Sequence, residues 1–286
     1  MNQPYLLFDA YSTVVELRRY TLHPGRRDEL VELFERELVE SQEAEGMRLV
    51  GQFRDLDHPD RFVWLRGFAD MAARGRALPA FYGGPVWKAH RDAANATMLD
   101  SDDVLLLRPA YSASGFQIPR LQRPPRGSTG DGSGLVVGTV YRPHGGVDRD
   151  FLDFFQYDMV PLLDATGAPV TAALVTETAA NNFPALPVRG DERVFAWFAR
   201  FDGPGAYAHH LRRLAAHPNW EGVLAPALRS RLSAPPEVLR LVPTVRSRLQ
   251  GLEHAPAQGL VSAASQVQQE PRHAAVVAQP LDAVGA

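Results

Sequence analysis

The stretch that decides the fold is FVWLRGF at residues 62–68, because the chain contains a close copy of it, FAWFARF, at residues 195–201. Both copies read Phe-x-Trp-x-x-x-Phe, and their residue numbers differ by 133. At the same spacing Trp87 corresponds to Trp220, so the 4 tryptophans of the chain form two corresponding pairs. A constant spacing of this kind indicates that one folding unit occurs twice.

Upstream of these copies the spacing between corresponding residues is 121 rather than 133. Three pairs show it: Tyr20 and Tyr141, Gly25 and Gly146, and Phe34 and Phe155. The second half is therefore 12 residues longer than the first. Insertions are tolerated best in surface loops, so we place these extra residues in a loop at about residues 179–191.

The hydrophobic patterns predict the same order of elements in both halves, strand, helix, strand, strand, helix and strand. In the first half we expect strands at 13–22, 48–54, 61–68 and 104–108, a helix at 27–44, and a broken helical region at 70–99. In the second half we expect strands at 135–142, 171–178, 193–201 and 238–242, and helices at 148–165 and, in pieces, 206–233. Pro161 is expected to kink or shorten the helix that contains it.

The predicted strands are apolar on both faces. In residues 62–68, Phe62, Trp64 and Phe68 lie on one face, whereas Val63 and Leu65 lie on the other, because side chains alternate along a strand. Two helices can cover only one face of a ferredoxin-like sheet, so the second sheet is the natural cover for the other. The sequence thus predicts an α+β fold, two tandem ferredoxin-like halves that form an intramolecular dimeric α/β barrel.

Composition sets the domain boundaries that we expect. The first ferredoxin-like half spans residues 12–111 and the second spans 135–248. Residues 112–134 are rich in Pro, Gly, Ser and Arg, which is typical of a linker rather than a packed element. Residues 249–286 lack steady periodicity and are expected to be a disordered tail. The first 11 residues lack the basic and apolar segments of a secretory signal.

Charge and cysteine content exclude several classes of function. The net charge of −3 provides no basic field for nucleic acid. The absence of cysteine excludes disulfides, thiol nucleophiles and cysteine-ligated metal sites. No stretch approaches the ~18 apolar residues of a membrane span. Of the 30 basic residues only Lys88 is a lysine, which indicates GC-rich bacterial coding. We therefore expect a cytoplasmic bacterial protein.

Four segments carry a resemblance to a known family. They are ELRRYTLHPG at residues 16–25, FVWLRGF at 62–68, WKAHRDAANATML at 87–99 and LLLRP at 105–109. With these motifs the first half resembles the NIPSNAP family of the dimeric α/β barrel superfamily. The second half keeps the spacing but has Val137, Thr139 and Ala199 in place of Glu16, Arg18 and Arg66, so it is similar to a diverged copy.

The resemblance implies small-molecule chemistry without naming a reaction. NIPSNAP proteins are mostly of undefined activity. The superfamily includes cofactor-free monooxygenases, isomerases and lyases that act on aromatic or polyketide-like compounds, and heme enzymes built from two fused halves. A shared fold raises the expectation of such chemistry but does not assign it.

The first strand carries the main candidate site. Glu16, Arg18 and Tyr20 share one face, and Arg66 lies one strand away. If that face borders a cavity, these side chains bind a carboxylate or phenolate, with Glu16 and Arg18 as catalytic residues and Tyr20 and Arg66 as substrate-binding residues. The alternative is a structural ion network in which carboxylate and guanidinium satisfy each other.

Other candidates lie on the helices and the paired strand. His90 follows Trp87 by three residues and is a candidate general base or axial heme ligand; the alternative is a partly exposed helical histidine. Tyr82 and Trp87, with Trp64, are candidate walls of an aromatic pocket, or simply packing residues. His209, His210 and His217 do not form a metal-binding spacing, so we expect no metal site.

Three hypotheses remain open. The first is a cofactor-independent enzyme of the monooxygenase, isomerase or lyase type, with its cavity in the first half and an aromatic or polyketide-like substrate. The second is a non-catalytic binding or adaptor protein, and the third is a heme-binding protein. We expect no other cofactor. The expected partners are a small-molecule ligand, with no nucleic acid or membrane, and pairing of the two halves within the chain; a homodimer is left open.

Overall fold

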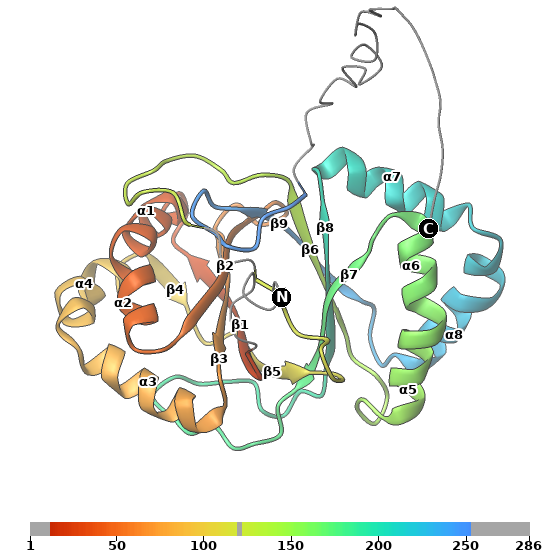
Figure 1. Ribbon diagram of the computed structural model, residues 1–286, viewed down its shortest axis with the longest axis horizontal. Helices are drawn as coiled ribbons and strands as arrows, with labels where there is room; N and C mark the ends of the chain where they lie inside the picture. Colours follow the sequence, from red (N-terminus) through yellow and green to blue (C-terminus); the bar gives the residue numbers. More distant parts are fainter. Residues whose placement is uncertain (1–11, 119–121, 253–286) are drawn as a thin grey trace, which may run out of the picture. The chain divides into compact units, whose positions relative to one another are not determined.

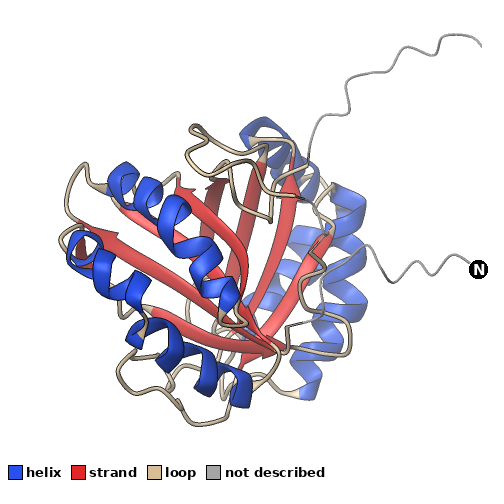
Figure 2. Cartoon of the chain, turned by 60° about the vertical axis from the view of Figure 1, so that its left-hand side comes forward, coloured by secondary structure: helices blue, strands red, loops and turns tan. Residues whose placement is uncertain are grey.

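The described part of the chain is built on a closed antiparallel barrel. The computed structural model describes residues 12–118 and 122–252 (Figure 1). Its strands form one sheet in the order β3-β2-β9-β6-β8-β7-β5-β1-β4, and the pairing of β3 with β1 closes eight of them into a barrel. The helices lie outside the strands (Figure 2). The predicted fold class is confirmed.

Each half supplies four barrel strands and its own helices. The first half contains β1 (Val14–Leu22), α1 (Arg27–Leu33), the π-helical turn η2 (Phe34–Leu38), α2 (Val39–Ala44), β2 (Arg48–Asp55), β3 (Arg61–Phe68), α3 (Met71–Gly83), α4 (Pro85–Asn95), the short β4 (Met98–Asp100) and β5 (Val104–Pro109). The second half contains β6 (Leu135–Tyr141), α5 (Arg149–Phe154), η3 (Phe155–Met159), α6 (Val160–Thr166), β7 (Val170–Thr176), β8 (Phe195–Phe201), α7 (Pro204–Ala215), η4 (Trp220–Leu224), α8 (Ala225–Arg231) and β9 (Glu237–Pro243).

Corresponding strands pair in the same register in both halves. In the first half β1 pairs with β3, and in the second β6 pairs with β8. The facing residues are Arg18 with Trp64 and Tyr20 with Phe62 in the first pair, and Thr139 with Trp197 and Tyr141 with Phe195 in the second. These positions differ by 121 and 133, so Trp64 and Trp197 occupy equivalent places.

Two seams join the halves. At one seam Phe53 of β2 faces Pro243 of β9, and at the other Leu107 of β5 faces Thr176 of β7. The buried Arg19 also links the halves, because its guanidinium lies 2.6 Å from Asp103 and 2.5 Å from Glu237. Neither sheet therefore has a free edge at the junction, and an exposed edge is what promotes aggregation.

The barrel interior is a packed apolar core shared by both halves. Val63 and Leu65 point into it, as predicted, together with Phe53 and Phe198, and all four are fully buried. Phe62, Trp64 and Phe68 lie on the other face, under the helices of the first half. Helices α1–α4 cover one side of the barrel and α5–α8 the other (Figure 1). The barrel interior is therefore filled by side chains from both halves, and each half has a second layer between its strands and its helices.

The predicted linker contains core residues, so that prediction was incomplete. Phe116 and Ile118 are each 7% exposed and belong to the interior core, where the Phe116 ring lies 5.1 Å from that of Phe198. The predicted tail also begins too early, because Leu249 is buried and its N–H donates to the Val50 carbonyl. The rest of the tail, from residue 253, and the N-terminal segment 1–11 lie outside the described residues.

The helix around Pro161 is irregular because of a π-helical turn, and the proline is not the cause of that turn. The helix continues through Pro161 to Thr166, and the π-helical turn η3 precedes it. The first half has the corresponding turn η2 although Glu40 stands at the corresponding position. The π-turns are thus a feature of both halves. None of the helices in the described part of the chain has both the length and the hydrophobicity needed to cross a bilayer.

We expect Phe116→Ala to lower the free energy of unfolding by about 3–5 kcal/mol, because it leaves a cavity against Phe198 in the barrel interior. Denaturant unfolding measures this change. Gln117→Ala is the matched control, since Gln117 is exposed, and it should change stability by less than about 0.5 kcal/mol. Equal effects of the two variants would show that residues 112–134 are a simple tether.

Candidate functional site

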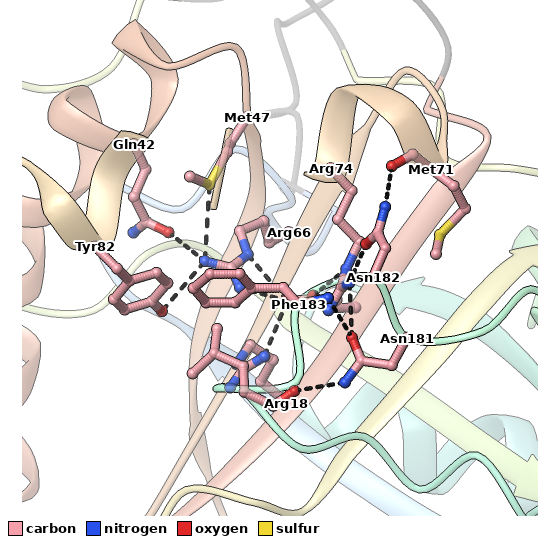
Figure 3. Close-up of polar contacts among 12 residues, drawn as sticks. Arg18, Gln42, Met47, Arg66, Met71, Arg74, Tyr82, Asn181, Asn182 and Phe183 are labelled. Carbon is pink, nitrogen blue, oxygen red and sulfur yellow. Dashed lines mark hydrogen bonds and ion pairs between the residues drawn. The ribbon is translucent and has the colours of Figure 1, made fainter. Parts of the chain in front are cut away.

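The structure brings the predicted residues of β1 and β3 together in the layer between the first sheet and α3 (Figure 3). One Glu16 oxygen lies 2.9 Å from Arg18 Nη1 and 2.5 Å from Arg66 Nη2. The other oxygen accepts a hydrogen bond from Arg74 Nε at 2.8 Å. All four side chains are at most 1% exposed. Arg74 is a member that the sequence analysis did not identify.

Three guanidinium groups surround one carboxylate, so neutral acceptors complete the network. Arg18 Nε donates to the Tyr20 hydroxyl at 3.0 Å, and Arg66 Nη1 donates to Gln42 at 2.9 Å. The Arg66 guanidinium also lies 4.9 Å from the centre of the Trp64 ring. Burial alone would raise the pKa of Glu16, but the three guanidinium groups, Arg66 foremost, hold it well below its usual range.

A loop from the second half covers this network. Arg74 Nη1 donates to the side-chain oxygens of Asn181 at 2.9 Å and Asn182 at 2.7 Å. Phe183 stacks on Tyr82 with ring centres 5.9 Å apart. The segment that follows β7 runs past α3 in Figure 1, and the three labelled residues reach the network in Figure 3. The 12 additional residues of the second half thus form a cap on the first half.

The remaining predicted residues are surface or packing residues in this structure. Trp87 and Tyr82 pack edge to face, with ring centres 5.0 Å apart. His90 on α4 is 31% exposed and its Nε2 lies 3.6 Å from Glu37. His90 therefore lies beside Glu37 and not beside Glu16 or Arg18. Glu16, Arg18, Tyr20, Arg66 and Trp64 are brought together, but in a layer that side chains and the cap fill.

A cavity lies instead in the corresponding layer of the second half. Its volume is about 330 Å³. It lies between strands β6, β8 and β9 and helices α6, α7 and α8. Aromatic and polar side chains from these elements line it: Tyr141, Trp197, Phe201, Tyr207, Trp220, Thr139, His210 and Arg229. Met159 of η3 and Trp220 of η4 also line it, and π-turns are frequent at functional sites.

The cavity exists because each member of the first-half ion network has an uncharged counterpart here. Val137, Thr139 and Ala199 replace Glu16, Arg18 and Arg66, in the register that the strand pairings establish. Helix α3 begins at Met71 and α7 at Pro204, so Arg74 corresponds to Tyr207 by the same spacing. Thr139 thus lines the cavity at the position of the long Arg18 side chain, and Ala199, which packs in the core of this half, stands at the position of Arg66.

The first-half loop that corresponds to the cap is too short to cover the second half in the same way. It is residues 56–60, between β2 and β3, and none of its residues lines the cavity. It lies against β9, where the Leu56 N–H donates to the Arg240 carbonyl at 2.9 Å. The second-half layer is therefore neither filled nor capped in the way that the first-half layer is.

The polar groups in the cavity wall are held in an apolar setting. Burial raises the pKa of Tyr141 to about 12, so the phenol is neutral at physiological pH. Burial lowers the pKa of His210, whose Nδ1 lies 3.3 Å from the Thr166 carbonyl. The Trp197 N–H is buried beside the Tyr141 hydroxyl, whose pKa it lowers, but among the described residues it has no acceptor with full hydrogen-bond geometry.

Sequence reasoning missed Tyr207 and His210 as site residues. A comparison of the two halves position by position would have shown them, because Arg74 becomes Tyr207 and Ala77 becomes His210 at the spacing of 133. These two positions, with Glu16, Arg18 and Arg66, are among those where the polar side chains of the two halves differ. Within residues 12–118 and 122–252, no group of three His, Asp or Glu side chains comes close enough to hold a metal ion.

We expect Glu16→Gln to lower the free energy of unfolding by about 3–5 kcal/mol at pH 7, because it leaves buried guanidinium groups uncompensated. The pKa of Glu16 is lowered by folding. Its contribution to the free energy of unfolding is therefore fully present above the unfolded-state pKa and is lost as the pH falls. Denaturant unfolding at a series of pH values from 7 to 3 should therefore show that the difference in free energy of unfolding between wild type and Glu16→Gln becomes smaller as the pH falls. Glu32→Gln is the control, because Glu32 is the exposed ion-pair partner of Arg36, and it should change the free energy of unfolding little. A gap that stays constant with pH would contradict this account.

Comparisons with known proteins bear on the first half. The NIPSNAP family model matches residues 15–113. No curated protein matches the chain. An uncharacterized NIPSNAP-like domain protein from Burkholderia xenovorans is 27% identical over 38% of this chain and 94% of its own, with a TM-score of 0.34. A NIPSNAP family protein from Agrobacterium tumefaciens is 21% identical over 35% of this chain and 94% of its own, with a TM-score of 0.33.

A longer similarity covers both halves. A protein from Lactobacillus acidophilus, provisionally assigned as a monooxygenase, is 15% identical over 81% of this chain and 94% of its own, with a TM-score of 0.48. The second half lies outside the residues that the family model matches. The predicted resemblance is thus confirmed for the part of the chain that carried its motifs: residues 15–113 match the NIPSNAP family model.

Proposed function

We propose that this protein binds a small, largely aromatic molecule in the cavity of its second half. The observation that carries the proposal is a volume of about 330 Å³ between sheet and helices, lined mainly by aromatic and aliphatic side chains. This volume lies at the lower end of the range of ligand pockets. Its few polar groups, among them Thr139, Tyr141 and His210, are placed to orient a ligand.

The contrast between the halves supports this location. In the first half the same layer contains the Glu16 network, whose charged groups are paired or capped. We assign that network a structural role, which was the alternative interpretation of those residues. In the second half the layer is open and uncharged apart from Arg229, which is exposed. Any reaction of the cofactor-independent type is placed at this cavity.

The aromatic walls suit a flat apolar ring system. Trp197 and Phe201 come from β8, Tyr207 from α7 and Trp220 from η4, so rings surround the cavity from strands and helices. Aromatic rings pack favourably edge to face or offset against one another, which gives about 0.5–1.5 kcal/mol per contact beyond area burial. A bicyclic aromatic compound such as 2-naphthol is therefore a suitable first probe.

We expect wild-type protein to bind 2-naphthol in equilibrium dialysis and Trp220→Ala to weaken this binding at least tenfold, because one aromatic wall is removed. Trp87→Ala is the matched control, since Trp87 is the counterpart of Trp220 in the first half and packs against Phe81 and Tyr82. It should leave the affinity within about twofold, with the fold of both variants checked by circular dichroism.

Two outcomes would overturn the proposal. If wild-type protein does not retain 2-naphthol or larger fused-ring compounds, the cavity is not a site for aromatic ligands. If Trp87→Ala abolishes binding while Trp220→Ala has no effect, the ligand occupies the first half, as the sequence analysis expected.

A further inference from the structure

We propose that His210 makes the cavity selective for ligands with a phenolic or enolic hydroxyl, by accepting the hydroxyl proton in a hydrogen bond at Nε2. This inference rests on the proposed function, because it names the class of ligand for the same cavity. It starts from the one buried histidine of that wall, which is 3% exposed and belongs to α7.

The neighbour of Nδ1 determines the tautomer. Nδ1 lies 3.3 Å from the Thr166 carbonyl oxygen, and a carbonyl oxygen can only accept. Nδ1 therefore carries the hydrogen. In a neutral imidazole one nitrogen is a donor and the other an acceptor, so Nε2 holds a free lone pair.

The surroundings keep the ring neutral. Burial is the main cause that lowers the pKa of His210, and the nearby Arg213 guanidinium acts in the same direction. A nearby carboxylate would favour the imidazolium form, but no carboxylate is among the groups that act on this pKa. A neutral ring is required, because a doubly protonated ring would offer a donor and not an acceptor.

The ring is also held in a defined orientation. Its centre lies 5.8 Å from that of Phe201 and 6.2 Å from that of Tyr207, which stacks nearly parallel to it. Since Nδ1 faces α6, Nε2 points to the opposite side of the ring. Among the described residues Nε2 has no hydrogen-bond partner, and the side chain lines the cavity.

The other polar groups of the wall do not impose the same selection. The Trp197 N–H can only donate, and the hydroxyls of Thr139 and Tyr141 can donate or accept. Among the side-chain nitrogen and oxygen atoms of the residues that line the cavity, Nε2 of His210 is the one that can only accept. A ligand that presents an O–H there gains a hydrogen bond, whereas a ligand with a methyl or ether group leaves a buried lone pair unsatisfied.

The test compares 2-naphthol with 2-methylnaphthalene, in which a methyl group replaces the hydroxyl. The ratio of the two dissociation constants is measured by equilibrium dialysis for wild type and for His210→Phe, which keeps an aromatic ring beside Phe201 and Tyr207. We expect His210→Phe to reduce the preference for 2-naphthol about tenfold while it still binds 2-methylnaphthalene, because one buried hydrogen bond is lost. Comparing this ratio between wild type and His210→Phe cancels the different transfer free energies of the two probes from water, which are the same for both proteins.

A second measurement needs no variant at this position. The absorption band of 2-naphthol bound to wild type should lie to the red of the band of 2-naphthol in cyclohexane, as donation of a hydrogen bond by its hydroxyl requires, while bound 2-methoxynaphthalene should show no such difference. If both probes bind and His210→Phe leaves their ratio unchanged, or if no red shift is seen, this inference is overturned and the proposed function stands. If neither probe binds wild type, the proposed function fails with it.

Discussion

The ion pair between Glu16 and Arg66 joins two neighbouring strands in the layer between sheet and helices, and the difference between the two halves depends on it. The two side chains are fully buried and their atoms are 2.5 Å apart. Arg18 and Arg74 bind the same carboxylate. Removal of one partner from such a buried group leaves the others unpaired at high cost. The network can therefore be kept whole or lost whole, and the second half has lost all four members.

The loss of the network changes what the layer can do. Val137, Thr139, Ala199 and Tyr207 need no ionic partners, and the layer that holds guanidinium groups in the first half contains a cavity of about 330 Å³ in the second. The barrel interior offers no comparable freedom, because Phe53, Phe198 and their neighbours fill it from both halves. The ligand space thus lies on the outer face of the sheet, under the helices. The first half contributes a filled layer and the second half contributes the cavity in which we propose that the ligand binds.

The inserted loop strengthens this division. Asn181, Asn182 and Phe183 belong to the second half by sequence, yet they complete the first-half network and pack on Tyr82. The amide oxygens offset positive charge that one carboxylate cannot balance alone. The corresponding loop at residues 56–60 is too short to cover the cavity in the same way. One insertion therefore closes one layer and leaves the other available.

The sequence by itself determined the fold, since the doubled Phe-x-Trp-x-x-x-Phe motif and the alternation of apolar residues on both strand faces require two sheets that cover each other. It also identified Glu16, Arg18, Tyr20 and Arg66 as neighbours, because β-strand periodicity puts the first three on one face and the predicted ferredoxin-like order of elements puts the strand of Arg66 in the same sheet. Only the tertiary structure decided that this cluster is closed and that the cavity lies in the other half. That outcome depends on side-chain volumes, on a loop that crosses from one half to the other, and on the orientation of His210 toward Thr166, none of which follows from hydrophobic pattern or residue spacing.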